Sequence, residues 1–392
     1  MFILRAYLLL VFGDIPAVSL VLRMKGHNGY SPCRMCYITG VPSLDEKSRV
    51  LYVPLDCSSH PKVLESPDGH VAAYDPLDLP LRTHTDFVAH AKEVQTAATN
   101  AEAEVLSRAY GIKGIPALSH LPSLSLPNCA PYDLMHLIFE NLLPNLIKHW
   151  TGKFKGLDDG KEAYQFTQAI WEAIGLDTAD AGRYYPSAYG PRVPNIAQDR
   201  SNFSAEMASF WMSYIGPVVL KRRFSKPKYY KHFVDLVCLV NKCLQFEITT
   251  DEINKVREGF KEWVVTYERF VYLFSSLIQA DVHLHSIYYQ HDPRRLSACP
   301  LTIHALLHIA DSIENMGPAW CYWAFPMERY CGALQPAIKS RRFPYASLDR
   351  FVVERAQLEQ INAIYGTADE MALRPPRDKI PRGAYAPAAC TS

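Results

Sequence analysis

Two short motifs of metal-binding type, far apart in the chain, constrain this sequence more than any other feature. Cys33 and Cys36 form a CxxC pair, and His304 and His308 form an HxxxH pair. Two thiolates separated by two residues can share one tetrahedral zinc ion, and histidines four apart stand on one face of a helix. Together they would complete a Cys2His2 set. If they do, the fold must bring together residues that are 268 positions apart in the sequence.

Each motif also has a simpler interpretation. A CxxC pair is typical of a redox dithiol as well, but that use favours a thioredoxin-like βαβ setting, which this sequence lacks. Ser31-Pro32 and the approach from Gly26 indicate a zinc-knuckle turn instead. Two histidines on a partly buried helix could each bond to a backbone carbonyl. The residues alone leave both interpretations of the histidines open.

Composition sets the class of protein. The chain has 392 residues, of which 48% are hydrophobic and 21% are charged, and its formal net charge is +1. This balance predicts a sizeable core, and any nucleic-acid role must come from local charge clusters.

The apolar opening Met1–Phe12 is broken by Arg5, lacks a signal cleavage site and is too short to span a bilayer. Scattered cysteines indicate an intracellular protein with mostly reduced thiols, and Cys238 and Cys243 are interpreted as core residues.

Periodicity predicts a small α/β element followed by a long helical region. Phe2–Phe12 is expected to be a buried strand that stops at Gly13-Asp14, with a short helix as the alternative. Residues 26–85 are rich in Gly, Pro, Ser and Asp and indicate loops and short strands. Residues 371–392 are expected to form a loose tail. Helices are predicted over Asp86–Arg108, Tyr132–Trp150, Glu206–Leu220, Tyr229–Phe246 and Asp251–Phe274, and in two segments near 301–335.

Three acidic positions are candidates for chemistry. Asp14 follows the expected strand, a rigid platform of the kind a metal-binding carboxylate needs, although an Asp after a strand is usually a turn residue. Glu328 lies among aromatic residues and Met, where a buried acid needs a partner, either Arg329 or a metal ion. Asp133 is expected to cap the helix that contains His136. A contribution of that pair to an active site is the alternative.

A basic strip occupies residues 221–231. Six of its eleven residues are Lys or Arg, and three are aromatic. This mixture predicts contact with nucleic-acid phosphates, and the alternative is a solvated helix face whose aromatic side chains lie in the core. A smaller basic cluster spans Lys339–Arg342. The side chains expected to contact DNA are Lys221, Arg222, Arg223, Lys226 and Lys228.

In this order, the motifs resemble those of the transposases of CACTA-like mobile elements, in particular the Plavaka-like group of fungal genomes. The likeness covers residues from about 2 to 345 and is carried by GDIPAVSLVLRMKGHNGYSPCRMC, SLPNCAPYDLMHLIFENLL, the strip from Lys221, and ACPLTIHALLHIADSIENMGPAWCYWAFPMERYCGAL. It implies an α+β fold, with part of an RNase H-like core interrupted by a large, mainly helical insertion. The resemblance divides the chain into four parts. These are a part of the core with the CxxC motif over 1–40, the insertion over 41–300, the HxxxH motif with the final catalytic helix over 301–345, and a C-terminal helix with a tail over 346–392.

The resemblance also implies chemistry and partners. Asp14 and Glu328 correspond to the second and third catalytic acids, and the CxxC and HxxxH residues correspond to the ligands of a structural Zn²⁺. The family's reaction is DNA cleavage and strand transfer with Mg²⁺ or Mn²⁺ held by three carboxylates. The implied setting is the nucleus, with transposon ends and target DNA as partners, a homodimer that pairs both ends, and no membrane.

One departure from the family pattern affects the activity that we expect. The first catalytic acid precedes the second in the family, but none of the thirteen residues before Asp14 is acidic. We therefore expect either a chain that begins late or a degenerate, inactive copy. The alternative function is a non-catalytic, zinc-stabilised remnant that binds DNA or a protein partner, and a third interpretation is an unrelated helical protein whose motifs coincide by chance.

Overall fold

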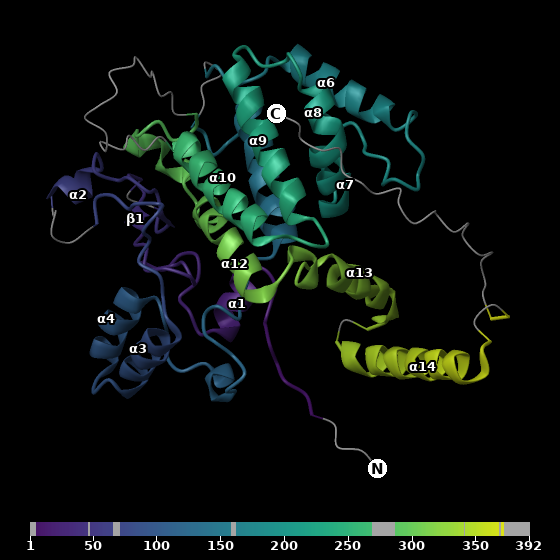
Figure 1. Ribbon diagram of the computed structural model, residues 1–392, viewed down its shortest axis with the longest axis horizontal. Coiled ribbons are helices and arrows are strands. Elements are labelled where there is room, and N and C mark those ends of the chain that lie inside the picture. The colour runs from purple at the N-terminus through teal and green to yellow at the C-terminus, as the bar shows by residue number, and fades with distance from the viewer. Residues whose placement is uncertain are drawn as a thin grey trace. The chain divides into compact units, whose positions relative to one another are not determined.

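The computed structural model describes residues 5–45, 48–65, 71–157, 162–268, 287–340, 342–367 and 370–371. The chain is rich in helices and divides into two compact units, Met1–Trp323 and Ala324–Ser392 (Figure 1). The boundary falls inside the segment 301–345, which the resemblance implies is one part. The HxxxH motif and Glu328 therefore belong to different units.

The strand predicted at the start of the chain is not present in residues 5–12, and residues 1–4 lie outside the described part. Residues 5–12 have no regular structure, and Tyr7 and Leu9 are 71% and 65% exposed. The prediction is wrong there because a strand needs neighbours that satisfy its backbone groups. Within the described ranges the only sheet is the antiparallel pair β1 (Val41–Pro42) and β2 (Leu51–Tyr52). The structure is thus compatible with an α+β class, and the RNase H-like core stays a prediction.

Asp14 stands at the start of a helix instead of at the end of a strand. Its Oδ1 accepts a hydrogen bond of 2.6 Å from the backbone N–H of Ala17, which caps α1 (Ile15–Val21). Pro16 lies in the first turn, where a helix needs no N–H donor. One face of α1 packs into an apolar cluster with α3 (His84–Thr96), and this anchors the residue that the sequence singled out.

The stretch expected as one helix over Asp86–Arg108 forms two helices. α3 ends at Thr96, and α4 (Asn100–Tyr110) begins after Thr99, whose side chain accepts a hydrogen bond from the N–H of Glu102. The Thr cap satisfies a free backbone donor and sets a new helix start that composition alone does not reveal.

The remaining helix predictions are confirmed within the described residues. The last part of the helix predicted over Asp251–Phe274, residues 269–274, lies outside the described residues. The sequence analysis did not predict α2 (Pro61–Glu65) or α6 (Gln168–Ala181). The confirmed elements are the π-helical η3 (Met135–Leu142) with α5 (Leu143–Trp150), α7 (Ala205–Phe210) with η5 (Trp211–Ile215) and α8 (Gly216–Val219), α9 (Pro227–Cys243), α10 (Thr250–Glu268), α11 (Leu301–His304) with η7 (Ala305–His308) and α12 (Ile309–Met316), and α13 (Phe325–Leu334).

The helical body of the first unit is held by a buried aromatic core. Trp150 packs edge-on against Phe233, with ring centroids 5.4 Å apart. α9 and α10 lie side by side and are tied by a reciprocal pair of contacts (Figure 1). Nε2 of His232 lies 3.2 Å from the carbonyl oxygen of Trp263, and Nε1 of Trp263 donates to the carbonyl oxygen of His232 at 2.9 Å. This body supports the histidine helix, because α12 packs against α10.

The second unit consists mainly of α13 and α14 (Pro344–Tyr365). Neither helix contains a buried residue. In the described part of the chain, no helix combines the length and the apolar character that a membrane span requires.

Candidate metal centre and adjoining pocket

The CxxC loop is held rigid by an arginine that the sequence analysis missed. Arg82 is 3% exposed, and its Nε donates to the carbonyl oxygens of Cys33 and Cys36 at 3.0 and 3.1 Å. Its Nη2 donates to Oγ of Ser31 at 2.7 Å. The side chain of Arg82, which lies two residues before the start of α3, thus fixes both ends of the CxxC loop. No motif marks this arginine, because its partners are oxygen atoms of residues 46 to 51 positions away.

The HxxxH pair lies on the helical segment that was predicted for it. Leu301–His304 form α11, a tight turn Ala305–His308 follows, and α12 continues from Ile309. Both imidazoles therefore project from one side of the segment, and their ring centroids are 5.1 Å apart.

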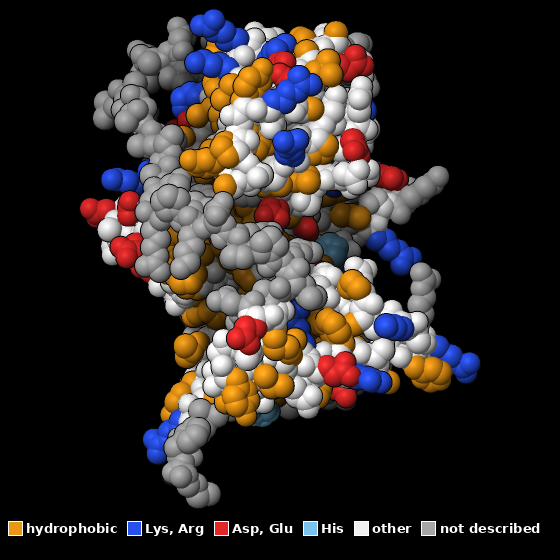
Figure 2. Space-filling model, turned by 90° about the vertical axis from the view of Figure 1, so that its right-hand side faces the viewer, with side chains coloured by type: hydrophobic (Ala, Val, Ile, Leu, Met, Phe, Trp, Pro, Cys, Tyr) orange, Lys and Arg blue, Asp and Glu red, His pale blue; other side chains and the backbone are white. Residues whose placement is uncertain are grey.

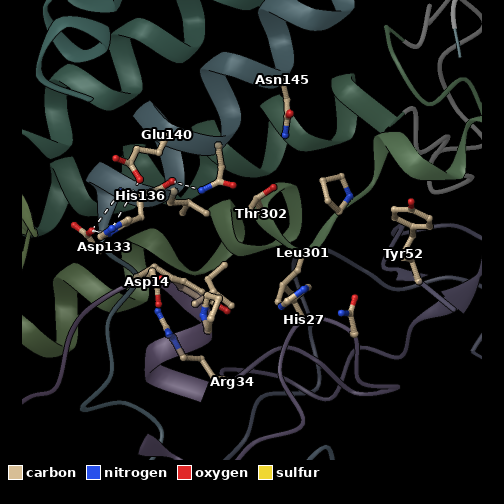
Figure 3. A pocket seen from close by; sticks show the side chains of 18 of the residues that line it. Asp14, His27, Arg34, Tyr52, Asp133, His136, Glu140, Asn145, Leu301 and Thr302 are labelled. Atoms are coloured by element: carbon tan, nitrogen blue, oxygen red, sulfur yellow. Dashed lines mark hydrogen bonds and ion pairs between the residues drawn. The ribbon is translucent and has the colours of Figure 1, made fainter. Parts of the chain in front are cut away.

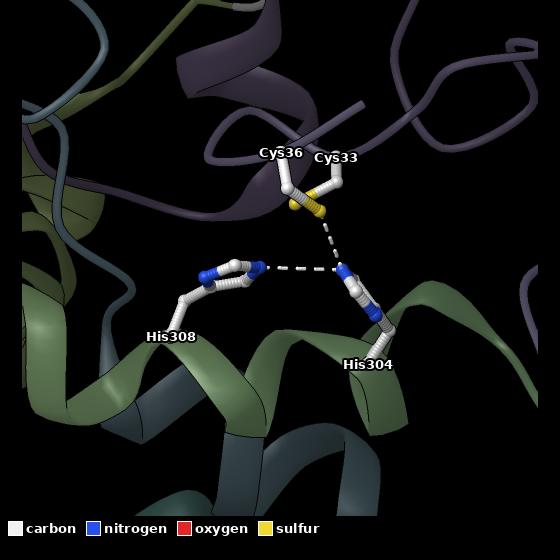
Figure 4. A group of neighbouring side chains, drawn as sticks. All are labelled: Cys33, Cys36, His304 and His308. Carbon is white, nitrogen blue, oxygen red and sulfur yellow. Dashed lines mark hydrogen bonds between the residues drawn. The ribbon is translucent and has the colours of Figure 1, made fainter. Parts of the chain in front are cut away.

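The four side chains meet in one buried cluster, as predicted. Their ligand atoms all lie within 4.8 Å of one another, and none of the four residues is more than 1% exposed. Figure 4 shows the two thiols facing the two imidazoles. Nε2 of His304 lies 3.1 Å from Sγ of Cys36 and 3.3 Å from Nε2 of His308.

These separations fit the ligands of a single ion. Zinc ligands at about 2.1 Å for nitrogen and 2.3 Å for sulfur stand roughly 3.5 Å apart in a tetrahedron. Two thiolates and two neutral imidazoles also suit a divalent cation, which balances both thiolate charges in a buried setting. The cluster could hold a metal ion and is compatible with structural zinc.

Burial and mutual charge shift the protonation of these groups strongly. Burial raises the pKa of the Cys33 thiol, but the hydrogen bond with Cys36 and the charges of the two imidazoles outweigh it and leave that pKa well below its usual value. The pKa of Cys36 lies well above its usual value because of burial and the neighbouring Cys33. Burial lowers the pKa of His304, whereas for His308 the Cys33 charge and a nearby carboxylate outweigh burial and raise the pKa to about 9.

A chain of contacts behind His308 orients its ring. Oδ2 of Asp311 lies 3.4 Å from Nδ1 of His308, on the side away from the other ligands. Arg257 in α10 pairs with Asp311 at 3.4 Å and with Glu314 at 2.5 Å. Carboxylates that hold the outer nitrogen of a metal-binding histidine fix its tautomer and increase its basicity. Asp311 is therefore a positioning residue of the centre, and it was not recognised from the sequence.

A pocket of about 490 Å³ adjoins the metal centre and contains Asp14. Tyr132 and Arg34 connect the two sites, because both line the pocket while Tyr132 places its hydroxyl 3.5 Å from Sγ of Cys33. Figure 3 shows Asp14 beside Asp133 and His136, with Glu140 above them and Arg34 below. The pocket thus gathers acidic, imidazole and guanidinium groups from α1, the CxxC loop and η3.

Asp133 caps its helix, as predicted, and also holds His136. Its carboxylate accepts hydrogen bonds from the N–H groups of Met135 and His136, at 3.2 and 3.3 Å. Oδ2 of Asp133 lies 2.5 Å from Nδ1 of His136. This hydrogen bond raises the pKa of His136 despite partial burial, and the charges of Asp133, Glu140 and Asp14 act in the same direction.

Glu328 belongs to the second unit. It lies in the first turn of α13, and its side chain is exposed there. Whether it is held by Arg329 or by a metal ion stays a prediction. Its role as third catalytic acid stays a prediction, as does that of the cluster Lys339–Arg342 in the same unit.

Two of the three aromatic residues of the basic strip face the core. Phe224 is 9% exposed and packs 4.5 Å from the ring of Phe166, and Tyr229 is 5% exposed. These two cannot stack on bases, so for them the alternative of aromatic side chains in the core holds, whereas Tyr230 is half-buried. The five cations expected to contact DNA differ in exposure. Lys221, Arg222 and Lys226 are exposed.

The other two cations of the expected DNA surface have partners within the protein. Arg223 pairs with Asp177 at 2.7 Å, and Lys228 lies 5.0 Å from the ring of Tyr229. On the face of the molecule that Figure 2 shows, Lys and Arg side chains are interspersed with apolar and acidic ones. Of the six cations of the strip, four are exposed, and one of these four, Lys231, is paired with Asp235. Three exposed cations, Lys221, Arg222 and Lys226, are therefore the main candidates for contact with DNA.

The first prediction concerns metal content. Purified protein should contain about one transition-metal ion per chain, because four buried ligands form one site. The double variant Cys33→Ser, Cys36→Ser should lose the ion and become less stable by about 3 kcal/mol when free metal exceeds its Kd by about 100-fold. Elemental analysis and urea unfolding measure both effects. Cys243→Ser, a buried thiol outside the cluster, is the control, and an unchanged metal content in the double variant would refute the site.

The second prediction concerns Asp311. Asp311→Asn should weaken Co²⁺ affinity by about 10- to 100-fold, because the amide no longer stabilises the ring of His308 as a carboxylate does. Optical titration with Co²⁺ measures the affinity. Glu314→Gln is a matched control, since Glu314 pairs with the same Arg257 and lies outside the four-ligand cluster. Equal decreases of affinity in both variants would assign the effect to Arg257 instead.

No family model, no curated protein and no solved structure matches this chain. The metal centre and its pocket must therefore be interpreted from their own chemistry and from the order of the motifs.

Proposed function

We propose that the chain is a transposase-like protein of a DNA mobile element, built around a structural zinc ion. The observation that carries the proposal is the cluster of Cys33, Cys36, His304 and His308. The resemblance implies one zinc site for these four positions from the order of the motifs alone. Two chance motifs separated by 268 residues would have no reason to meet at ligand distance in a buried site.

The position of Asp14 supports the same proposal. The resemblance requires a catalytic carboxylate close to the zinc centre, and Asp14 lines the pocket that shares Arg34 and Tyr132 with that centre. α1 anchors Asp14 in an apolar cluster, which gives the carboxylate a fixed position. In the family's reaction Mg²⁺ or Mn²⁺ activates the attacking hydroxyl and stabilises the leaving oxygen. Asp14 and Glu328 are the residues of this chain proposed to hold such ions.

A second function, a non-catalytic scaffold that binds DNA or a protein partner, has its own support. The resemblance assigns only two catalytic acids to this sequence, Asp14 and Glu328. The metal centre needs no catalytic acid to stabilise a fold. In either case we propose a nuclear protein whose partners are transposon ends and target DNA, and which acts as a homodimer.

The third prediction separates these two functions. The chain alone should show no Mg²⁺- or Mn²⁺-dependent nicking of supercoiled DNA, because two carboxylates hold a pair of ions less well than three. Gel assays of the metal-loaded protein test this. Nicking that disappears in both Asp14→Asn and Glu328→Gln would show that the chain is an active enzyme and would exclude the scaffold function. Nicking that persists in both variants would point to a contaminant.

The fourth prediction tests DNA binding itself. Wild-type protein should bind duplex DNA without sequence preference, and the triple variant Lys221→Ala, Arg222→Ala, Lys226→Ala should bind more weakly. The salt slope of log Kd should fall by about one for each phosphate that the variant no longer neutralises, up to about three. Fluorescence anisotropy at several salt concentrations measures the slope.

Two controls make this experiment specific. Lys231→Ala removes a cation that is paired with Asp235 at 2.7 Å, and it should change the slope little. Phe224→Ala should lower stability without a separate effect on DNA, since the ring is packed in the core. If wild-type protein has no affinity for DNA at low salt, the proposed function is wrong.

A further inference from the structure

Three lysines near the end of α5 form a cationic group that the sequence analysis did not single out. Lys148 lies in the last turn of α5, and Lys153 and Lys155 follow in the turn after it. The backbone N–H of Lys153 donates to the carbonyl oxygen of Lys148 at 2.8 Å, which folds this turn back onto the helix end. All three side chains are exposed. Within the described part of the chain, none of them forms an ion pair with a carboxylate.

Lys155 brings this group to the edge of the Asp14 pocket. Its side chain lines the pocket beside Tyr52, and its Nζ lies 4.9 Å from the centre of the Tyr52 ring. Figure 3 shows Tyr52 and Asp14 toward opposite sides of this pocket. The backbone of Lys155 has a φ of 47°, in the left-handed region that residues other than glycine rarely adopt. The turn thus holds a cation at the side of the pocket opposite Asp14.

Neighbouring groups leave the charge of Lys155 without a counter-charge. The pKa of Lys155 is lowered, first by partial burial and then by the positive charge of Lys148. Its Nζ donates to the carbonyl oxygen of Ser297 at 3.5 Å, a long contact with a group that carries no formal charge. Partial loss of water and repulsion between two ammonium groups both make an anion beside them favourable.

The lysine group adjoins the basic strip over residues 221–231. Trp150, which lies between Lys148 and Lys153 in the sequence, packs edge-on against Phe224 of the strip, with ring centroids 5.5 Å apart. Both rings are buried. Two segments with exposed, unpaired cations therefore flank the same pair of buried rings. The exposed cations on the side of the strip are Lys221, Arg222 and Lys226.

One wall of the pocket also leads toward the lysines. Asn141 and Asn145 line the pocket from η3 and α5, which follow each other without a break. Lys148 comes three residues after Asn145, so the two lie on the same side of α5. Asp14 and Glu140 supply negative charge to the pocket. The charge therefore changes from negative in the pocket to positive at the end of α5.

A nucleic-acid strand fits this distribution of charge. Its phosphates recur along one chain, so successive phosphates can meet successive lysines. A single small anion would need only one or two of these ammonium groups. The strand would approach from the cationic side, because the carboxylates on the other side repel a phosphate that arrives without a metal ion.

Simpler explanations exist for two of the lysines. A cation in the last turn of a helix interacts favourably with the helix dipole, which accounts for Lys148. The ring of Tyr52 attracts the ammonium group of Lys155. Neither explanation accounts for Lys153, or for the gathering of three unpaired cations between a pocket and a second cationic segment.

We propose that Lys148, Lys153 and Lys155 contact the phosphates of a DNA strand and extend the basic strip to the Asp14 pocket. This inference rests on the proposed function, which names DNA as the partner. Lys155 contacts a phosphate at the pocket, and the other two lysines contact phosphates outside it.

The test measures DNA binding by the metal-loaded, full-length chain and by its triple variant Lys148→Ala, Lys153→Ala, Lys155→Ala. The probe is a fluorescein-labelled duplex with a single-stranded 3′ end, and anisotropy is followed at several salt concentrations. The variant should bind more weakly. Its salt slope of log Kd should fall by about one for each phosphate contact that is lost, up to about three.

A control variant of equal charge separates local contact from net charge. Three exposed lysines outside the pocket and outside both cationic segments are changed to Ala together, and the salt slope should stay close to that of wild type. Circular dichroism and metal content check the fold of both triple variants. If the first triple variant does not fold, its three single variants decide, and each should lower the slope by about one. The control substitutions are Lys62→Ala, Lys92→Ala and Lys113→Ala.

A second measurement places the strand at the pocket. His27 is exposed and lines the pocket, whereas His120 is exposed and lies outside it. On addition of saturating DNA, the NMR signals of the His27 ring should shift in wild type and shift much less in Lys155→Ala. The signals of His120 should stay in place in both proteins.

Three results would overturn the inference. In the first, wild type binds DNA and the lysine variant keeps both its affinity and its salt slope. In the second, both triple variants lose the same slope, so that net charge alone explains the effect. In the third, the His27 signals of DNA-bound wild type do not shift. All three leave the proposed function intact, whereas wild type without any DNA affinity at low salt would overturn the proposed function and this inference together.

Discussion

The fold of the first unit depends on one long-range closure, the meeting of the CxxC loop and the histidine helix. The two motifs are separated by 268 residues, and closing a loop of that length has an entropic cost that grows only slowly with length. A metal ion bound by both motifs would hold the two ends of this loop together, and its binding free energy would add to the stability of the fold.

The metal centre and the pocket are mechanically one structure. Arg82 fixes the backbone of the CxxC loop from outside, and Arg34, inside that loop, carries its guanidinium into the pocket wall. Tyr132 contacts Cys33 through its hydroxyl and Arg34 through its ring. A change in the coordination of the cysteines would therefore be transmitted to the pocket through Arg34 and Tyr132.

The four-ligand cluster and most helices could be predicted from the sequence, because local patterns reveal them. Contacts between distant residues could not be predicted in this way. CxxC and HxxxH are local patterns whose spacing reports ligand geometry directly. Arg82 and Asp311 act on these ligands through backbone oxygens and an outer ring nitrogen, and no spacing reveals such contacts. The strand expected before Asp14 failed because an apolar run does not disclose whether neighbours are present. The aromatics of the basic strip were misjudged because composition does not show which face of a helix they occupy.

Asp14 illustrates why a local role does not exclude a chemical one. Its Oδ1 caps α1, and a capping carboxylate is a common structural feature. Yet the cap uses one oxygen, whereas a carboxylate has two oxygens and several lone pairs available to a ligand. The cap also holds the side chain in one rotamer at the pocket edge. Asp133 shows the same pattern, since it caps η3 and orients His136 at once. In both cases the helix start is what gives the acid a defined direction, and a defined direction is the property that a binding site requires.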